Sequence, residues 1–131
     1  MDILNVLEKA TQINSVSGSE NEIRKFISDN VKKYCDELSV DAMGNLIAHK
    51  KGSGKKIMFA AHMDEIGIIV TDIDDKGFVR FSSVGGLNLR NLVNLRVRFA
   101  NGVEGVIGAE EESFKDKPAI SKLYVDLGAA D

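Results

Sequence analysis

The sequence predicts an α/β fold whose character changes near Glu65. Up to that residue, two stretches with apolar residues at helical spacing are combined with short apolar runs of strand type. Beyond it, the pattern is that of short strands and turns alone, as in small barrels. We therefore expect parts of two domains, an α/β part with two helices and a buried sheet over residues 1–66 and the first strands of a small β-barrel over residues 67–131.

Two helices are expected in the first 34 residues. In the first, Asp2 is placed to cap a stretch whose apolar residues recur at helical spacing: Ile3, Val6, Leu7 and Ala10. In the second, Ser19 and Glu22 form a capping box ahead of an apolar stripe. That stripe consists of Ile23, Phe26, Ile27, Val31 and Tyr34. Between the helices lies the turn SVSGSE, in which Gly18 can adopt a positive φ.

Strand patterns begin at Leu38. The segment LSVDAMGNLIAHK predicts two short strands joined by a turn over residues 41–45. After the polar loop KKGSGKK, residues 57–61 form a continuous apolar run, which predicts an interior strand covered on both faces. We expect the second helix to pack on this strand through its apolar stripe.

The part after Glu65 reads as hairpins. GIIVTDI and GFVRFSSV flank the turn DDKG, and residues 95–99 alternate apolar side chains with arginines. Asn101-Gly102 leads into VEGVIG and is the strongest hairpin signal in the chain, and KLYVDLG predicts a last strand. Neither part is obviously finished, because a barrel normally needs five or more strands to close. Unpaired strand edges and apolar faces predict that the chain is not a stable monomer. It would pair with a second chain that supplies the missing strands or self-associate through residues 67–131.

Composition excludes several classes of protein. A hydrophobic content of 44% with 28% charged residues predicts a soluble globular chain, and the net charge of −3 argues against a nucleic-acid surface. No apolar run is long enough to span a membrane, and the N-terminus does not have the pattern of a signal peptide. The single cysteine, Cys35, excludes an internal disulfide, so we expect a cytoplasmic protein.

The apolar run at residues 57–61 ends in a cluster of polar residues: His62, Asp64 and Glu65. In an extended segment, side chains two residues apart leave on the same face, and ligands gather at the carboxyl ends of strands in open α/β sheets. A neutral imidazole is a common ligand for zinc, cobalt or manganese, and a nearby carboxylate can hold its orientation. On residue types alone, a hydrogen-bonded strand end is the commoner explanation of a His-x-Asp pair.

The surrounding motifs favour the metal site. AAHMDEIGIIV resembles the AHMDEIG signature of the tetrahedral, dodecamer-forming metalloaminopeptidases, also called glutamyl aminopeptidases and, in older usage, endoglucanases. Further segments are similar to this family in family order over essentially all 131 residues: SVSGSENEIRKFI, VDAMGNLIAHKKG, FSSVGGLN, LRVRFANGVEGVIG and LYVDLGA. The resemblance implies the N-terminal part of a metallopeptidase α/β sandwich and the opening strands of an inserted, PDZ-like β-barrel that mediates assembly.

The resemblance also implies an activity and its residues. Such a peptidase removes N-terminal residues from peptides with a water activated by two divalent metal ions, zinc or cobalt. His62 would be a metal ligand, Asp64 a catalytic residue that orients it, and Glu65 a carboxylate without a metal role. Its partners would be a peptide substrate and copies of itself, in a dimer-based dodecamer, with neither nucleic acid nor membrane.

The family's remaining metal ligands and its general base have no counterpart in the sequence. The run Glu110-Glu111-Glu112 could be mistaken for the family's glutamate pair, but we expect it to lie in a solvated loop. We expect His49 to be exposed. The chain alone is therefore expected to be inactive, with a second chain or a self-assembly supplying what is missing. The alternative is a non-catalytic, self-associating module with no chemistry of its own. Polysaccharide hydrolysis would need a pair of carboxylates flanking a sugar bond and ranks below both.

Overall fold

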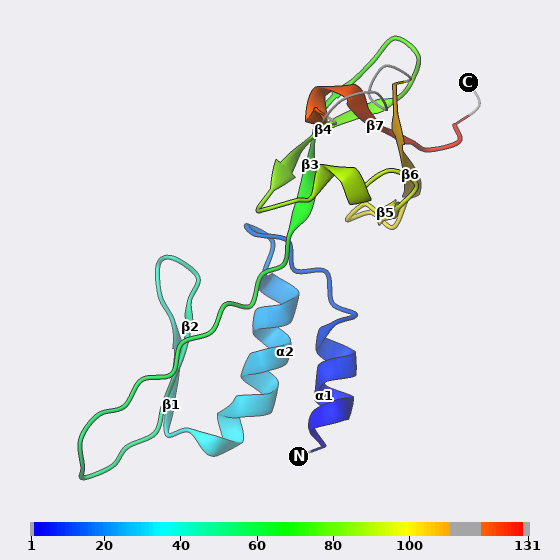
Figure 1. Ribbon diagram of the computed structural model, residues 1–131. Helices are drawn as coiled ribbons and strands as arrows, with labels where there is room; N and C mark the ends of the chain where they lie inside the picture. The colour runs from blue at the N-terminus through cyan, green and yellow to red at the C-terminus, as the bar shows by residue number, and fades with distance from the viewer. Residues whose placement is uncertain (1, 111–118, 130–131) are drawn as a thin grey trace. The chain divides into compact units, whose positions relative to one another are not determined.

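The computed structural model describes residues 2–110 and 119–129 and has a mixed α/β fold (Figure 1). The chain divides into two compact units, Met1–Glu65 and Ile66–Asp131. The first unit contains the helices and a two-stranded sheet, and the second contains a five-stranded sheet. The first unit therefore combines α-helices with a hairpin, whereas the second is mainly an antiparallel sheet.

The first helix, α1, spans Ile3–Ala10 and is capped as predicted. Asp2 adopts an extended backbone, and its Oδ1 accepts hydrogen bonds from the backbone N–H groups of Leu4, at 3.1 Å, and Asn5, at 3.4 Å. Two of the unpaired donors at the helix start are thereby satisfied. The apolar residues Ile3 and Leu7 remain exposed.

The second helix, α2, spans Asn21–Val31, and its predicted capping box is wrong. The N-cap is Glu20, whose side chain makes no cap hydrogen bond and instead accepts the N–H of Gly18 at 2.6 Å. Ser19 belongs to the preceding turn, where its N–H bonds to the carbonyl of Val16 at 2.8 Å. The turn therefore uses the residue that the capping pattern assigns to the helix. Gly18 has the expected positive φ, 90°.

The apolar stripe of α2 is only partly confirmed. Ile23 is buried, and Phe26, Ile27 and Val31 are half-buried, whereas Tyr34 is exposed. Residues Lys32–Tyr34 form a 3₁₀-helix, η1. Because a 3₁₀ turn has three residues rather than 3.6, it rotates Tyr34 away from the stripe that the α-helical period predicts.

Strands β1, Glu37–Val40, and β2, Leu46–His49, form the predicted antiparallel hairpin. Asp41 closes its turn, since its Oδ1 accepts the N–H groups of Met43 and Asn45, both at 2.9 Å. Arg24 of α2 donates from Nε to the carbonyl of Gly44 at 2.8 Å. This contact ties the hairpin turn to the helix.

The predicted interior strand at residues 57–61 is wrong for the described part of the first unit. No strand is present there, and the side chains of Ile57, Met58 and Phe59 are 79%, 87% and 94% exposed. The predicted packing of α2 on this run fails for the same reason. A run that is apolar on both faces becomes an interior strand only when strands flank it on both sides. In the described part of the first unit the sheet consists of β1 and β2 alone, and the run pairs with neither of them.

The second unit is an antiparallel sheet with strand order β3-β4-β7-β6-β5 (Figure 1). Its strands have these bounds: β3 Gly67–Ile73, β4 Val79–Val84, β5 Arg96–Arg98, β6 Glu104–Ala109 and β7 Leu123–Asp126. The 3₁₀-helices η2, Leu89–Asn91, and η4, Ile120–Lys122, accompany them. The predicted hairpins β3–β4 and β5–β6 and the predicted last strand are confirmed.

The second unit has a hydrophobic core of its own. The buried cluster consists of Val79, Phe81, Leu92, Ile107, Leu123 and Val125. Val97 of β5 and Phe99 after it pack against this cluster, as the alternation at residues 95–99 predicts, whereas Leu95 of the same alternation is exposed. Within residues 66–110 and 119–129 the sheet is open, with β3 and β5 as its edge strands. The second unit therefore has a five-stranded sheet and a core of its own, although the sheet does not close into a barrel within these residues.

Candidate metal-binding site

Three side chains of the first unit form a chain of hydrogen bonds that ends at an exposed imidazole. The Nδ1 atom of His62 lies 2.9 Å from Oδ1 of Asp64 and 3.0 Å from the carbonyl oxygen of Asp64. The hydroxyl of Ser17 donates to the other carboxylate oxygen, Oδ2, at 2.5 Å. The His62 side chain is 86% exposed. The structure thus brings the two predicted site residues together and adds a third.

The contacts of Nδ1 fix the proton of the His62 ring. Both of its neighbours are hydrogen-bond acceptors, a carboxylate oxygen and a carbonyl oxygen, so Nδ1 must carry the proton that it donates. In the neutral ring, the other nitrogen, Nε2, then holds the free lone pair. An imidazole in this tautomer, with a carboxylate behind it and Nε2 open, is the arrangement in which histidine binds metal ions.

The Asp64 carboxylate is kept ionised by its two partners. The Ser17 hydroxyl and, second, the His62 ring hydrogen-bond to it, and they hold the pKa of Asp64 below its ordinary value. A hydrogen bond to the charged form favours that form. Asp64 is therefore an acceptor for the His62 N–H group rather than a competing proton donor.

The turn that carries Ser17 is fastened to the segment that carries Asp64. Val16 and Glu65 form an isolated parallel bridge, and the N–H of Glu65 bonds to the carbonyl of Ser15 at 2.9 Å. The Oε1 atom of Glu65 accepts the N–H of Ser15, also at 2.9 Å, and Ser15 is buried. Glu65 thus holds the backbone of the site, which agrees with the structural role expected for it.

The donors within residues 2–110 and 119–129 are too few for a complete metal site. No group of three or more histidine, cysteine, aspartate or glutamate side chains gathers there, whereas a catalytic zinc usually has three protein ligands. His49 is exposed, as predicted, and its Nδ1 atom lies 3.4 Å from Oε2 of Glu37. A metal site at His62 would therefore need further ligands from outside the described residues.

The glutamate run is not a second metal site in the described part of the chain. Glu110 accepts hydrogen bonds from Arg80 at 3.0 Å and from Lys122 at 2.9 Å. The prediction of a solvated loop is therefore wrong at Glu110, which is ion-paired. Glu111 and Glu112 lie outside the described residues. Glu110 therefore stabilises the second unit.

The order of the three groups excludes a serine nucleophile. In a Ser-His-Asp triad the hydroxyl bonds to the imidazole, which takes its proton. Here the carboxylate of Asp64 stands between Ser17 and His62 and bonds to both. The Ser17 proton therefore points at a carboxylate of lowered pKa, which is a poor base.

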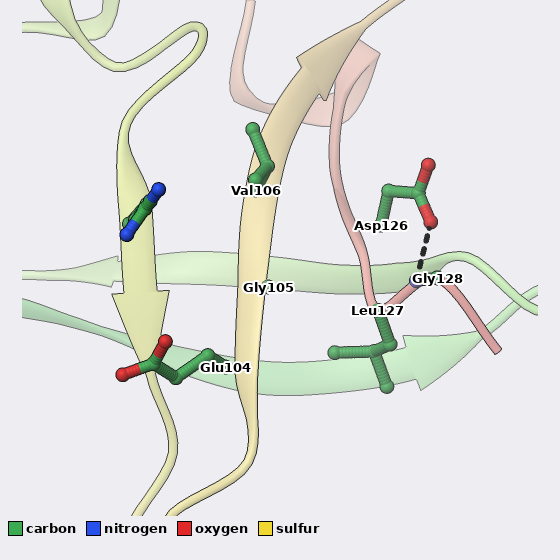
Figure 2. Close-up of a pocket in the computed structure, with 7 residues that line it drawn as sticks. Glu104, Gly105, Val106, Asp126, Leu127 and Gly128 are labelled. Carbon is green, nitrogen blue, oxygen red and sulfur yellow. Dashed lines mark hydrogen bonds between the residues drawn. The ribbon is translucent and has the colours of Figure 1, made fainter.

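The second unit contains a shallow hollow of about 320 Å³ over β5, β6 and the end of β7 (Figure 2). Its lining residues are Arg96, Glu104, Gly105, Val106, Asp126, Leu127 and Gly128. The carboxylate of Asp126 is used within the chain, because it accepts the N–H of Gly128 at 2.8 Å. Glu104 is paired with Arg98. The hollow holds no cluster of ligand or catalytic side chains.

The family of the chain follows from comparison with known proteins. The model of the M42 glutamyl aminopeptidase family matches residues 44–131, which include His62 and Asp64. The chain is 54% identical over 130 residues to a protein of Acetivibrio thermocellus that is named as an aminopeptidase by similarity. The match covers 98% of this chain and 39% of that protein. The chain belongs to the M42 glutamyl aminopeptidase family.

Solved structures agree in fold. The aminopeptidase of the archaeon Desulfurococcus kamchatkensis matches with a TM-score of 0.84 at 35% identity, over 95% of this chain and 37% of that one. The TET1 peptidase of Pyrococcus horikoshii, described as assembling into a tetrahedron or a large octahedral shell, matches with a TM-score of 0.78 at 38% identity, over 98% and 41%.

The chain spans about two fifths of the length of these relatives, 37% to 41%. The comparisons give no support to the alternative of a self-contained module without chemistry. Among the helices of residues 2–110 and 119–129, none is long and apolar enough to cross a membrane.

Proposed function

We propose that the chain is the N-terminal segment of a dinuclear metalloaminopeptidase, which hydrolyses N-terminal residues from peptides with a metal-activated water. In this proposal His62 binds one of two divalent ions, zinc or cobalt, through Nε2, and Asp64 orients the ring. The observation that carries it is the hydrogen bond from Nδ1 of His62 to Asp64, at 2.9 Å, which leaves Nε2 exposed. Family membership supplies the class of reaction.

The chemistry divides between the ions and this chain. When bound, a metal pair lowers the pKa of a shared water and polarises the scissile carbonyl. Asp64 accepts the Nδ1 proton of His62, which selects the tautomer, raises the basicity of Nε2 and fixes the ring plane. The general base and the other ligands belong to parts outside the described residues. The chain alone should therefore turn over no aminoacyl p-nitroanilide.

Assembly and location are parts of the same proposal. The second unit would be the start of the inserted, PDZ-like barrel through which copies associate into a dimer-based dodecamer. The likeness to the Pyrococcus horikoshii TET1 peptidase, with its tetrahedral or octahedral shells, supports this assignment. A cytoplasmic location fits a chain with a single cysteine, Cys35, which can form no internal disulfide.

The test uses the longer protein that contains this segment. His62→Ala should abolish hydrolysis of aminoacyl p-nitroanilides and reduce the bound metal measured by plasma mass spectrometry. Asp64→Asn should lower kcat about 10–100-fold while more of the metal stays bound, because it removes an orienting group and not a ligand. His49→Ala is the matched control and should keep parental activity, since His49 lies exposed beside Glu37. Parental activity in both site variants would refute the assignment.

A further inference from the structure

Ser17 lies 47 residues before the carboxylate that it contacts, and nothing in the spacing of the sequence connects the two. Its hydroxyl donates to Oδ2 of Asp64 at 2.5 Å, while Oδ1 of the same carboxylate faces Nδ1 of His62 at 2.9 Å. Each carboxylate oxygen of Asp64 therefore has its own partner, one on each side. We propose that Ser17 is a positioning residue, which sets the plane of the Asp64 carboxylate and through it the direction of Nε2 of His62.

The need for such an anchor follows from exposure. The side chain of Asp64 is 35% exposed and that of His62 is 86% exposed, so packing holds neither of them in one rotamer. The terminal torsion of an aspartate is broad, and a carboxylate near water rotates readily between solvent partners. With Oδ2 fixed by Ser17, the remaining oxygen stays directed at Nδ1. A hydrogen bond to a charged acceptor is shorter and stronger than a neutral one, which suits this task.

The backbone of the turn holds Ser17 without using its side chain. The N–H of Ser19 bonds to the carbonyl of Val16 at 2.8 Å, and the N–H of Gly18 bonds to Glu20 at 2.6 Å. Gly18 has a φ of 90°, a conformation that favours glycine. Together with the Ser15–Glu65 bonds, these contacts determine where residue 17 lies. Removal of the hydroxyl should therefore leave the turn in place and free only the carboxylate.

The inference rests on the proposed function, because it takes His62 as the metal ligand. The first measurement avoids activity and metal altogether. Nitrogen-15 NMR of the histidine rings in this chain, at about pH 8.5 where imidazoles are in general neutral, reports which nitrogen carries the proton. The parent should show His62 with its proton on Nδ1. Ser17→Ala should show a smaller share of this tautomer, because only the backbone carbonyl of Asp64 then stays fixed as an acceptor. Ser17→Thr, which keeps a hydroxyl, should resemble the parent.

The second measurement uses the longer protein. Competition with a chelator should show metal binding weakened about tenfold in Ser17→Ala, the lower end of what loss of an outer hydrogen-bond partner costs. The value of kcat should fall more than KM changes, and Ser17→Thr should restore both quantities. Ser19→Ala is the matched control, since it removes an exposed hydroxyl from the same turn. Thermal unfolding should be the same in all three variants.

The outcomes separate the two proposals. If His62→Ala loses metal while Ser17→Ala keeps the parental tautomer and metal affinity, Ser17 has no positioning role and the proposed function stands. If Ser17→Ala, Ser17→Thr and Ser19→Ala all lose affinity equally, the effect belongs to the turn, and the role of the hydroxyl is refuted. If His62→Ala keeps its metal, the proposed function fails instead.

Discussion

At the scale of single residues, the geometry of the site depends on which atoms of Asp64 are already engaged. One carboxylate oxygen faces Ser17 and the other faces His62, so a single carboxylate oxygen is directed at the imidazole. The pairing of His62 with Asp64 was predictable, because a separation of two residues places both side chains on one face of an extended segment. Ser17 was not, because the SVSGSE segment predicts a turn but not what lies against it.

Another residue-scale feature is the close approach of strands at Gly105 of β6. A Cβ atom there would collide with Cγ1 of Val125 and lie 2.9 Å from the carbonyl oxygen of Asp126. Gly105 also borders the hollow of the second unit (Figure 2). A glycine therefore permits the tight packing of β6 against β7 and its continuation.

We expect Gly105→Ala to lower the free energy of unfolding of the second unit by about 1–3 kcal/mol, the usual cost of overpacking. Gly86→Ala is the control, since a Cβ atom at Gly86 meets nothing within 4 Å, and its effect should stay within about 0.5 kcal/mol. Urea denaturation of the chain followed by circular dichroism measures both. Equal stability of the two variants would contradict the packing at Gly105.

At the scale of elements, hairpins are the features that the sequence predicts best, because each turn is closed by its own residues. Asp41 and Asp74 bind the backbone N–H groups of their own turns, so the signal is local. The failures have non-local causes. Ser19 belongs to the preceding turn and does not cap the helix. Residues 57–61 would need flanking strands to become an interior strand, and they pair with neither β1 nor β2.

Ion pairs connect three elements of the second unit through Arg80 of β4. Its guanidinium donates to Asp74 in the β3–β4 turn, at 2.8 and 3.0 Å, and to Glu110 after β6, at 3.0 Å. Burial alone would raise the pKa of Asp74, but Arg80 and the turn N–H groups outweigh it and lower that pKa. Lys122 and, second, Arg80 lower the pKa of Glu110.

This pairing predicts a pH dependence of stability. Because the folded pKa of Glu110 lies below its ordinary value of 4.5, the folded state binds fewer protons there than the unfolded state. The stabilisation is therefore complete well above pH 4.5 and is lost as the pH falls below it. Glu110→Gln should lower the Tm at neutral pH, and the difference from the parent should shrink towards zero in acid.

Thermal unfolding of both proteins between about pH 3 and pH 7 measures this difference. Glu104→Gln is the control, because its pair with Arg98 lies on the open surface, where such pairs contribute little. It should shift the Tm less than Glu110→Gln does at neutral pH. A Glu110→Gln difference that is constant over the whole range, or that grows in acid, would contradict the role of Glu110.

At the scale of the whole molecule, the two units differ in how much they bury. Among residues 66–110 and 119–129 of the second unit six apolar side chains are buried, whereas Ile23 is the buried apolar side chain in the described part of the first. The first unit also carries the exposed run at residues 57–59. Contiguous exposed apolar surface marks interaction or aggregation, so this run is a further site of association for the chain, beside the one proposed for the second unit.

We expect the chain to self-associate, with an apparent mass that rises with concentration in multi-angle light scattering. Met58→Ser should reduce this rise, because it interrupts the apolar run. Met43→Ser is the matched control, since Met43 has the same exposed fraction, 87%, but lies alone in the β1–β2 turn. A monodisperse monomer at all concentrations, with cooperative unfolding, would contradict the expectation and favour a self-contained module.

Metal binding by His62 through Nε2, with Asp64 holding Nδ1, can be seen directly by anomalous diffraction at the zinc or cobalt edge from crystals of the longer protein. We expect a metal peak about 2.0–2.1 Å from Nε2 of His62, with the Nδ1–Asp64 hydrogen bond intact. A bound metal pair that does not contact His62, or that binds it through Nδ1, would refute this role of His62.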